Sequence, residues 1–156
     1  MIDRPALPVE HHFAKYCSTK VLICDPDSND VVGIAPQAYR PRPIDDGELS
    51  GNHLEFFKAP SIAEDVAALA KHLTDSKLLT IRPSGRFAVG QVGQMKVAAK
   101  SCGVEIEIIE DPIVGPPADP AHALIMGISL NALLAQEELA KVATPYKPPL
   151  PPKPIF

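Results

Sequence analysis

The chain has few of the residues that mark disulfide frameworks, cysteine metal sites and membrane segments. Its 156 residues include three cysteines, which form no Cys-x-x-Cys pair, so we expect neither a disulfide framework nor a cysteine zinc site. The first residues lack the basic start and the unbroken apolar run of a signal peptide. No segment approaches the roughly 20 apolar residues that span a bilayer. These absences predict a cytoplasmic protein with reduced thiols and no membrane segment.

Basic residues are outnumbered and scattered along the chain. The 15 lysines and arginines stand against 19 aspartates and glutamates, which gives a formal net charge of -4 at pH 7. A protein that neutralises several phosphates needs clustered lysine and arginine. The sequence also contains no complete cofactor or metal motif. We therefore expect no nucleic-acid partner, no cofactor and no metal.

What the sequence does contain is the hydrophobic pattern of an α+β domain. A chain of this length with 46% hydrophobic and 22% charged residues can bury a core of its own. The turn-rich stretch DPDSND between two short apolar runs predicts a hairpin, and Ser61 with Glu64 forms a capping box that begins a helix. Strands are predicted at residues 21–24, 31–35, 78–81, 86–89, 104–110 and 123–128, and helices at 61–73, 92–102 and 130–142.

The strand, helix and second strand over residues 86–110 are similar in order to a βαβ unit. Together with the hairpin, this unit predicts a mixed β-sheet with about three helices. We expect a single α+β domain over residues 1–143, with the N-terminal ten residues irregular.

Residues 144–156 form a proline-rich C-terminal tail. Proline at this density predicts an extended polyproline II segment that does not join the core as regular structure. Pro148, Pro151 and Lys153 follow the P-x-x-P-x-K order that aromatic-lined grooves bind. The tail therefore has two interpretations, a contact for a protein partner or a second copy of the chain, and a disordered end.

Four motifs occur in a recognisable order: VVGIAPQAYRPR, LSGNHLEFF, FAVGQVGQMK and DPAHALIMG. They resemble the motifs of a family of small uncharacterised bacterial proteins, and the likeness covers roughly residues 30–140. The chain departs from the family pattern at Gly51 and His53, where a β-branched residue and an aromatic residue are expected. Because no activity is known for that family, the resemblance implies a bacterial, cytosolic setting and a shared fold but no catalytic residues.

His122 in DPAHALIMG is open to two interpretations. With Cys17 as nucleophile it would serve a Cys/His hydrolase, in which Lys15 and Lys20 lower the pKa of the thiol. Alternatively, its two ring nitrogens hold the proline-rich loop 111–120 by hydrogen bonds to backbone that must be satisfied. The sequence shows no third residue that would orient the histidine.

The motif LSGNHLEFF is also open to two interpretations. As an active site it would use Glu55 as base and His53 as acid or ligand. As a structural segment it would pack its leucine and phenylalanine side chains while Asn52 and Glu55 bind nearby backbone.

The turn GQVG, from Gly90 to Gly93, connects a predicted strand to a predicted helix. Backbone amides at the start of the helix could receive an anion, with Arg86 and Lys96 within reach. The alternative is that these glycines only permit a tight turn.

One set of possible metal ligands is Asp111, Asp119 and His122, with His11 and His12 added. Aspartate and histidine are suitable ligands, but an Asp-x-x-His spacing on an irregular segment is common by chance. The sequence therefore does not predict a metal site here.

These observations lead to one main hypothesis about function and two alternatives. The main hypothesis is a small cytosolic bacterial interaction or accessory protein that works with a larger protein partner. The hypothesis includes a role in an operon for conflict or defence. It depends on the missing catalytic signatures and the extended tail. The alternatives are a Cys/His hydrolase using Cys17 and His122, and a small anionic-ligand binder at residues 90–93.

Overall fold

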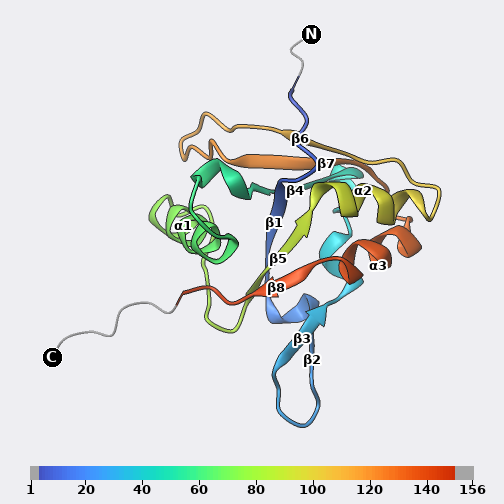
Figure 1. Ribbon diagram of the computed structural model, residues 1–156, viewed down its shortest axis with the longest axis horizontal. Helices are drawn as coiled ribbons and strands as arrows, with labels where there is room; N and C mark the ends of the chain where they lie inside the picture. Colours follow the sequence, from blue (N-terminus) through green and yellow to red (C-terminus); the bar gives the residue numbers. More distant parts are fainter. Residues whose placement is uncertain (1–3, 150–156) are drawn as a thin grey trace, which may run out of the picture.

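A six-stranded β-sheet runs through the middle of the computed structural model, which describes residues 4–149 (Figure 1). Its strands lie in the order β6-β7-β4-β1-β5-β8, and every neighbouring pair is antiparallel. The strands of this sheet are β1 (His12–Cys17), β4 (Gly47–His53), β5 (Arg86–Gln91), β6 (Glu107–Glu110), β7 (His122–Ile128) and β8 (Thr144–Tyr146).

A separate hairpin of β2 (Leu22–Cys24) and β3 (Val31–Ile34) projects from one end of the molecule (Figure 1). The hairpin was expected from the turn between two apolar runs, and the structure confirms it. Short 3₁₀ helices connect several of the strands. They are η1 (Thr19–Val21), η2 (Pro36–Tyr39), η3 (Pro43–Asp45) and η4 (Leu54–Phe57).

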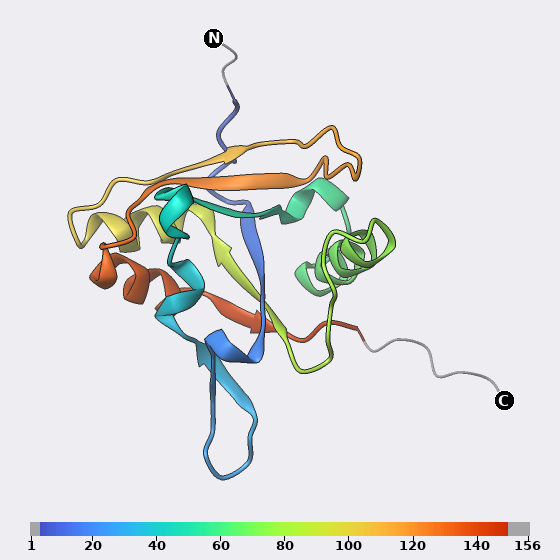
Figure 2. The same ribbon diagram turned by 180° about the vertical axis from the view of Figure 1, so that it is seen from behind.

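Helices cover both faces of the sheet, as the two views of the ribbon show (Figures 1 and 2). On one face α1 (Ile62–Asp75) buries an apolar stripe against Ala14, Phe87 and Val89. On the other face α2 (Val92–Lys100) and α3 (Leu133–Lys141) pack over a larger core. None of the described helices is long and apolar enough to cross a membrane.

The predicted start of α1 is confirmed in detail. Ser61 has extended backbone angles, and its hydroxyl accepts a hydrogen bond from the backbone N–H of Glu64 at 3.2 Å. This contact satisfies one of the N–H groups that the first helical turn leaves without a partner. The α+β class and the three helices are confirmed as well.

The sheet itself differs from the prediction in its pairing. The strands β5 and β6 on either side of α2 run in the same direction, but β1, β4 and β7 lie between them. No pair in the described part of the chain is parallel, so the predicted mixed sheet is an antiparallel one. Sequence order alone predicts neighbouring strands, whereas here three strands from elsewhere in the chain fill the space.

Two predicted elements are corrected. Residues 78–81 form no strand, because Leu78 and Leu79 donate backbone hydrogen bonds to Leu73 and so close the end of α1. The start of the proline-rich tail does join the sheet, since β8 pairs with β5. Pro145 is compatible with β8 because this strand is at the edge of the sheet, where a missing N–H costs no ladder hydrogen bond.

Gly51 in β4 occupies a site that no larger residue fits. A Cβ atom there would lie 2.3 Å from Cζ of Phe13 and 2.7 Å from the carbonyl oxygen of Ala14. The Phe13 ring, which is fully buried, therefore fills the space of the missing side chain. This explains why a β-branched residue, expected here from the family resemblance, is incompatible with Phe13 on the neighbouring strand, whose register partner is His53.

We predict that Gly51→Ala lowers the free energy of unfolding by about 1–3 kcal/mol, the usual cost of overpacking a core. Urea unfolding followed by circular dichroism measures this change. Gly33→Ala is the matched control, because a Cβ at Gly33 has its nearest neighbour at 3.7 Å. A Gly51→Ala protein as stable as the control would show that the Phe13 ring does not need this space.

Candidate functional site

A cleft of about 340 Å³ opens where β1 and β4 separate. The two strands pair only at Phe13 with His53 and at Ala14 with Asn52, whereas β1 and β5 pair along the whole of β1. Beyond this short ladder the strands diverge, and Asn52 on β4 and His122 on β7 line the space between them. The two residues are directly opposite each other in the β4–β7 ladder.

The opposite wall of the cleft is apolar. It consists of Leu73 at the end of α1, Leu78 and Leu79 in the turn that follows, and Ile113 from the proline-rich loop. Leu79 and Ile113 are 47% and 40% exposed. An apolar wall facing a few fixed polar groups is the usual composition of a small-molecule site, and the volume lies at the small end of the range for such sites.

Asp119 forms the centre of the polar wall. Its side chain is almost fully buried, and both of its oxygens accept hydrogen bonds from Nδ2 of Asn52, at 3.2 and 3.0 Å. Oδ1 also accepts from Nε2 of His72 on α1 at 3.0 Å. A buried carboxylate is stable only when its oxygens are satisfied in this way. No local pattern indicates this pairing, because His72 and Asp119 are 47 positions apart.

His122 is oriented by Asp111. Its Nδ1 atom lies 3.0 Å from the backbone oxygen of Asp111 and 3.1 Å from Oδ2 of the same residue. Both partners are acceptors, so Nδ1 carries the proton and the neutral ring has a free lone pair on Nε2. The other carboxylate oxygen of Asp111 binds Nη1 of Arg4 at 2.6 Å. Asp111 is therefore the residue that orients His122, which the sequence did not reveal.

Lys15 and Tyr16 of β1 complete the cleft on the side away from His122. The ammonium group of Lys15 donates a hydrogen bond to the backbone oxygen of Ser50 at 3.3 Å, and burial lowers the pKa of this lysine. The hydroxyl of Tyr16 binds both the backbone N–H and the backbone oxygen of Arg82. These contacts fix the edge of the cleft against the turn before β5.

Cys17 and His122 are not brought together. Cys17 is buried in the core under α2 and α3, whereas His122 shares the opposite face of the sheet with Asn52. The sheet register places His122 two strands away from β1 and level with Ala14, which is three positions before Cys17. The backbones of Cys17 and His122 are therefore roughly 14 Å apart. Burial also raises the pKa of the Cys17 thiol, which disfavours the thiolate. This geometry does not allow the Cys/His hydrolase.

The turn at Gly90 to Gly93 does not offer free amides either. The N–H of Val92 donates to the backbone oxygen of His11, and the N–H of Gly93 donates to that of Val9, both at 2.9 Å. The start of α2 is thus occupied by the N-terminal segment, which lies against it. Arg86 is at the far end of β5, with Nη1 bound to the backbone oxygens of residues 83 and 85, and Lys96 pairs with Glu107 at 3.5 Å.

Glu55, the acidic residue of the LSGNHLEFF motif, faces β1. One of its oxygens accepts a hydrogen bond from the backbone N–H of His12 at 2.7 Å, and the other is paired with Nδ1 of the same residue. The structural interpretation of the motif predicted such a backbone contact for Glu55. The same interpretation predicted a backbone contact for Asn52, but in the structure Asn52 binds the Asp119 side chain. In the tail, Pro148 is buried, and Pro151 and Lys153 lie outside the described residues.

The possible metal ligands named from the sequence do not form one cluster in the structure. Asp111 pairs with His122, while the Asp119 carboxylate binds Asn52 and His72. Each of these carboxylates already has partners of its own. In the described part of the chain, the group of side chains close enough together to hold an ion is His11, His53 and Glu55.

We predict that Asp119→Asn lowers the free energy of unfolding by about 1–3 kcal/mol, because one carboxylate oxygen becomes an NH₂ donor and the buried donors of Asn52 and His72 must share the one acceptor oxygen that remains. Urea unfolding at neutral pH measures the loss. Asp27→Asn in the exposed hairpin turn is the control, and we expect it to change stability by less than about 0.5 kcal/mol. Equal effects of the two substitutions would contradict a structural role for the Asp119 carboxylate.

Comparison of the chain with models of protein families, with curated proteins and with solved structures gave no match. The resemblance to a family of small bacterial proteins therefore stays a prediction. What the site does has to be inferred from the chemistry of its own residues.

Proposed function

We propose that the protein binds a small organic molecule in the cleft between β1 and β4, and that Nε2 of His122 accepts a hydrogen bond or a proton from it. The observation that carries the proposal is the position of His122, which is oriented by Asp111 and faces an apolar wall. An imidazole held through one nitrogen presents the other as a base, the arrangement on which general base catalysis depends.

The ligand class follows from the two walls. Leu78, Leu79 and Ile113 would contact an apolar group, Nε2 of His122 would accept a hydrogen bond from a hydroxyl, and the ammonium of Lys15 would donate to a carboxylate. The Asp119 carboxylate is already satisfied by Asn52 and His72, so it does not attract a cation strongly. A small aromatic or branched carboxylic acid or phenol is therefore favoured over an amine.

The test is protein-observed NMR titration with benzoate, phenol and benzylamine. We expect benzoate or phenol to shift the resonances of Asn52, His122 and Leu79, and benzylamine to shift them several-fold less. Leu79→Asp should remove the response, because it places a charge on the apolar wall. Leu134→Asp is the matched control, since Leu134 is an exposed leucine on α3, on the other face of the sheet.

Two results would contradict this proposal. One is the absence of saturable shifts at the cleft with any of the three probes. The other is an equal loss of response in the Leu79→Asp and Leu134→Asp proteins, which would indicate a general change of the fold and not a local one.

A role as a cytosolic bacterial accessory protein is a second proposal, and a different observation favours it. The β2–β3 hairpin projects from the molecule, and Ile23 and Val32 on it are 47% and 62% exposed (Figure 1). Both border a groove of about 370 Å³ between the hairpin and α3. Exposed apolar side chains beside a groove are typical of protein-docking surfaces.

Affinity capture from a bacterial lysate tests this second proposal. We expect Val32→Lys to lose proteins that the unaltered chain retains, because a charge on the hairpin opposes burial of the apolar surface. Lys20→Ala, a substitution at an exposed residue just before the hairpin, is the control. Recovery of the same proteins with all three chains would contradict docking through the hairpin.

A further inference from the structure

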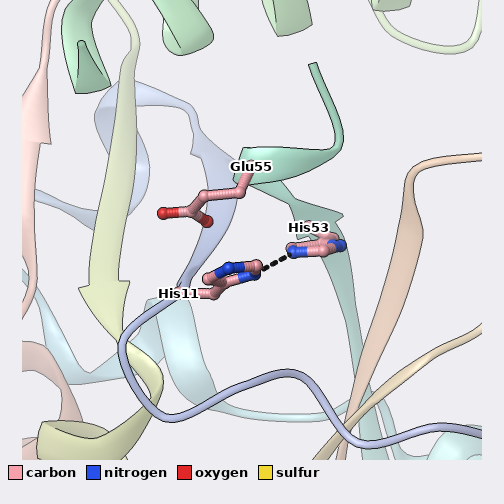
Figure 3. Close-up of side chains that lie close together, drawn as sticks. All are labelled: His11, His53 and Glu55. Atoms are coloured by element: carbon pink, nitrogen blue, oxygen red, sulfur yellow. Dashed lines mark hydrogen bonds between the residues drawn. The ribbon is translucent and has the colours of Figure 1, made fainter. Parts of the chain in front are cut away.

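Two histidine rings meet on the side of β4 that faces away from the cleft. His53 is the last residue of β4 and His11 comes just before β1, and Nδ1 of His11 lies 2.8 Å from Nε2 of His53 (Figure 3). The rings are stacked, with centroids 5.0 Å apart. Because Asn52 and His53 are consecutive strand residues, their side chains leave opposite faces of the sheet. The histidine pair is therefore separate from the cleft.

The backbone holds both histidines in place. The carbonyl oxygen of His11 accepts the N–H of Val92 at the start of α2, and the N–H of His53 donates to the carbonyl oxygen of Ala121 at 2.8 Å. Both contacts link distant parts of the chain, so the two rings are positioned by the fold. A site of this kind is preorganised and does not have to be assembled by a ligand.

Glu55 provides a third ligand atom in the same place. A carboxylate oxygen of Glu55, one ring nitrogen of His11 and one ring nitrogen of His53 all lie within 4.8 Å of one another. Figure 3 shows the carboxylate close to the His11 ring. The hydrogen bond from the backbone N–H of His12 fixes the carboxylate, and each oxygen keeps a second lone pair for another partner.

A carboxylate lies near the nitrogen of the His53 ring that does not face His11. The second ring nitrogen of His53, Nδ1, lies 4.0 Å from a carboxylate oxygen of Glu110. A carboxylate behind a histidine is the usual outer partner that orients a metal-binding imidazole.

We propose that His11, His53 and Glu55 bind Zn²⁺, with a fourth position open to water or to a ligand. Two imidazoles and one carboxylate are a ligand set found in zinc enzymes, in which the open position is the reactive one. Bonds of about 2.0–2.1 Å require nitrogen atoms about 3.3 Å apart in a tetrahedral site. The two rings have to separate by roughly 0.5 Å, which a small side-chain rotation supplies.

The preference among ions follows from the two nitrogen ligands. Mg²⁺ and Ca²⁺ bind oxygen atoms and retain water, so a site with two imidazoles selects against them. Zinc binds nitrogen and oxygen together and tolerates a site with three protein ligands. Zinc is therefore expected to bind in the presence of excess Mg²⁺.

Isothermal titration of the chelator-treated full chain with ZnCl₂ tests the proposal. We expect one ion per chain with a dissociation constant in the micromolar range or below. His11→Gln and His53→Gln should each abolish binding, and His72→Gln should retain it, because His72 is a histidine outside the cluster. Co²⁺ in place of zinc should give the intense visible absorption of a four-coordinate ion, which His11→Gln removes.

Further variants separate the cluster from other zinc ligands. Glu110→Gln should weaken zinc binding by roughly 10- to 100-fold without removing it, as expected for a positioning residue behind His53. Cys24→Ser should leave binding unchanged, although Cys24 is an exposed thiol. Circular dichroism of each variant confirms the fold, and His11→Gln is decisive if His53→Gln does not fold.

Three outcomes would overturn the zinc site. They are the absence of stoichiometric zinc binding by the unaltered chain, full binding by the His11→Gln protein, and loss of binding in Cys24→Ser or His72→Gln. None of them bears on the cleft, because the probes for the cleft contain no metal.

Discussion

The buried carboxylate of Asp119 holds three distant parts of the chain together. It binds Asn52 on β4 and His72 on α1, and its own backbone forms a two-way bridge with Ile113 in the proline-rich loop. Together with the contact between Asp111 and His122, it fixes the loop against the sheet and supplies the polar wall of the cleft. The cost of burying the charge is offset by three hydrogen bonds, which are stronger because the acceptor is ionised.

Pairing of histidine with carboxylate recurs throughout the described structure. His12 faces Glu55, His53 faces Glu110, His72 faces Asp119 and His122 faces Asp111. In three of these pairs the carboxylate binds one ring nitrogen, whereas in the His53–Glu110 pair the two atoms are 4.0 Å apart. This leaves His122 with a free lone pair at the cleft and His53 with a nitrogen directed at His11. The two proposed sites therefore depend on the same local chemistry on opposite faces of one sheet.

Local sequence patterns predicted the elements better than they predicted the site. The capping box at Ser61, the turn of the β2–β3 hairpin and the alternating residues before Glu110 are signals within a few positions of each other, and they gave the correct element types. The strand expected at 78–81 failed because a short apolar run is also compatible with a helix end that packs on the core. Cys17 and His122 were grouped by residue type alone, and the register placed them on opposite faces.

The sequence by itself determined the α+β class, the three helices and which residues could take part in acid–base or metal chemistry. Only the tertiary structure decided which of them meet. The order of the strands brings β4 between β1 and β7, and this places Asn52 beside His122 and His53 beside His11. Such contacts join residues more than 40 positions apart, and they depend on register and on the face from which each side chain leaves its strand, which a local pattern does not contain.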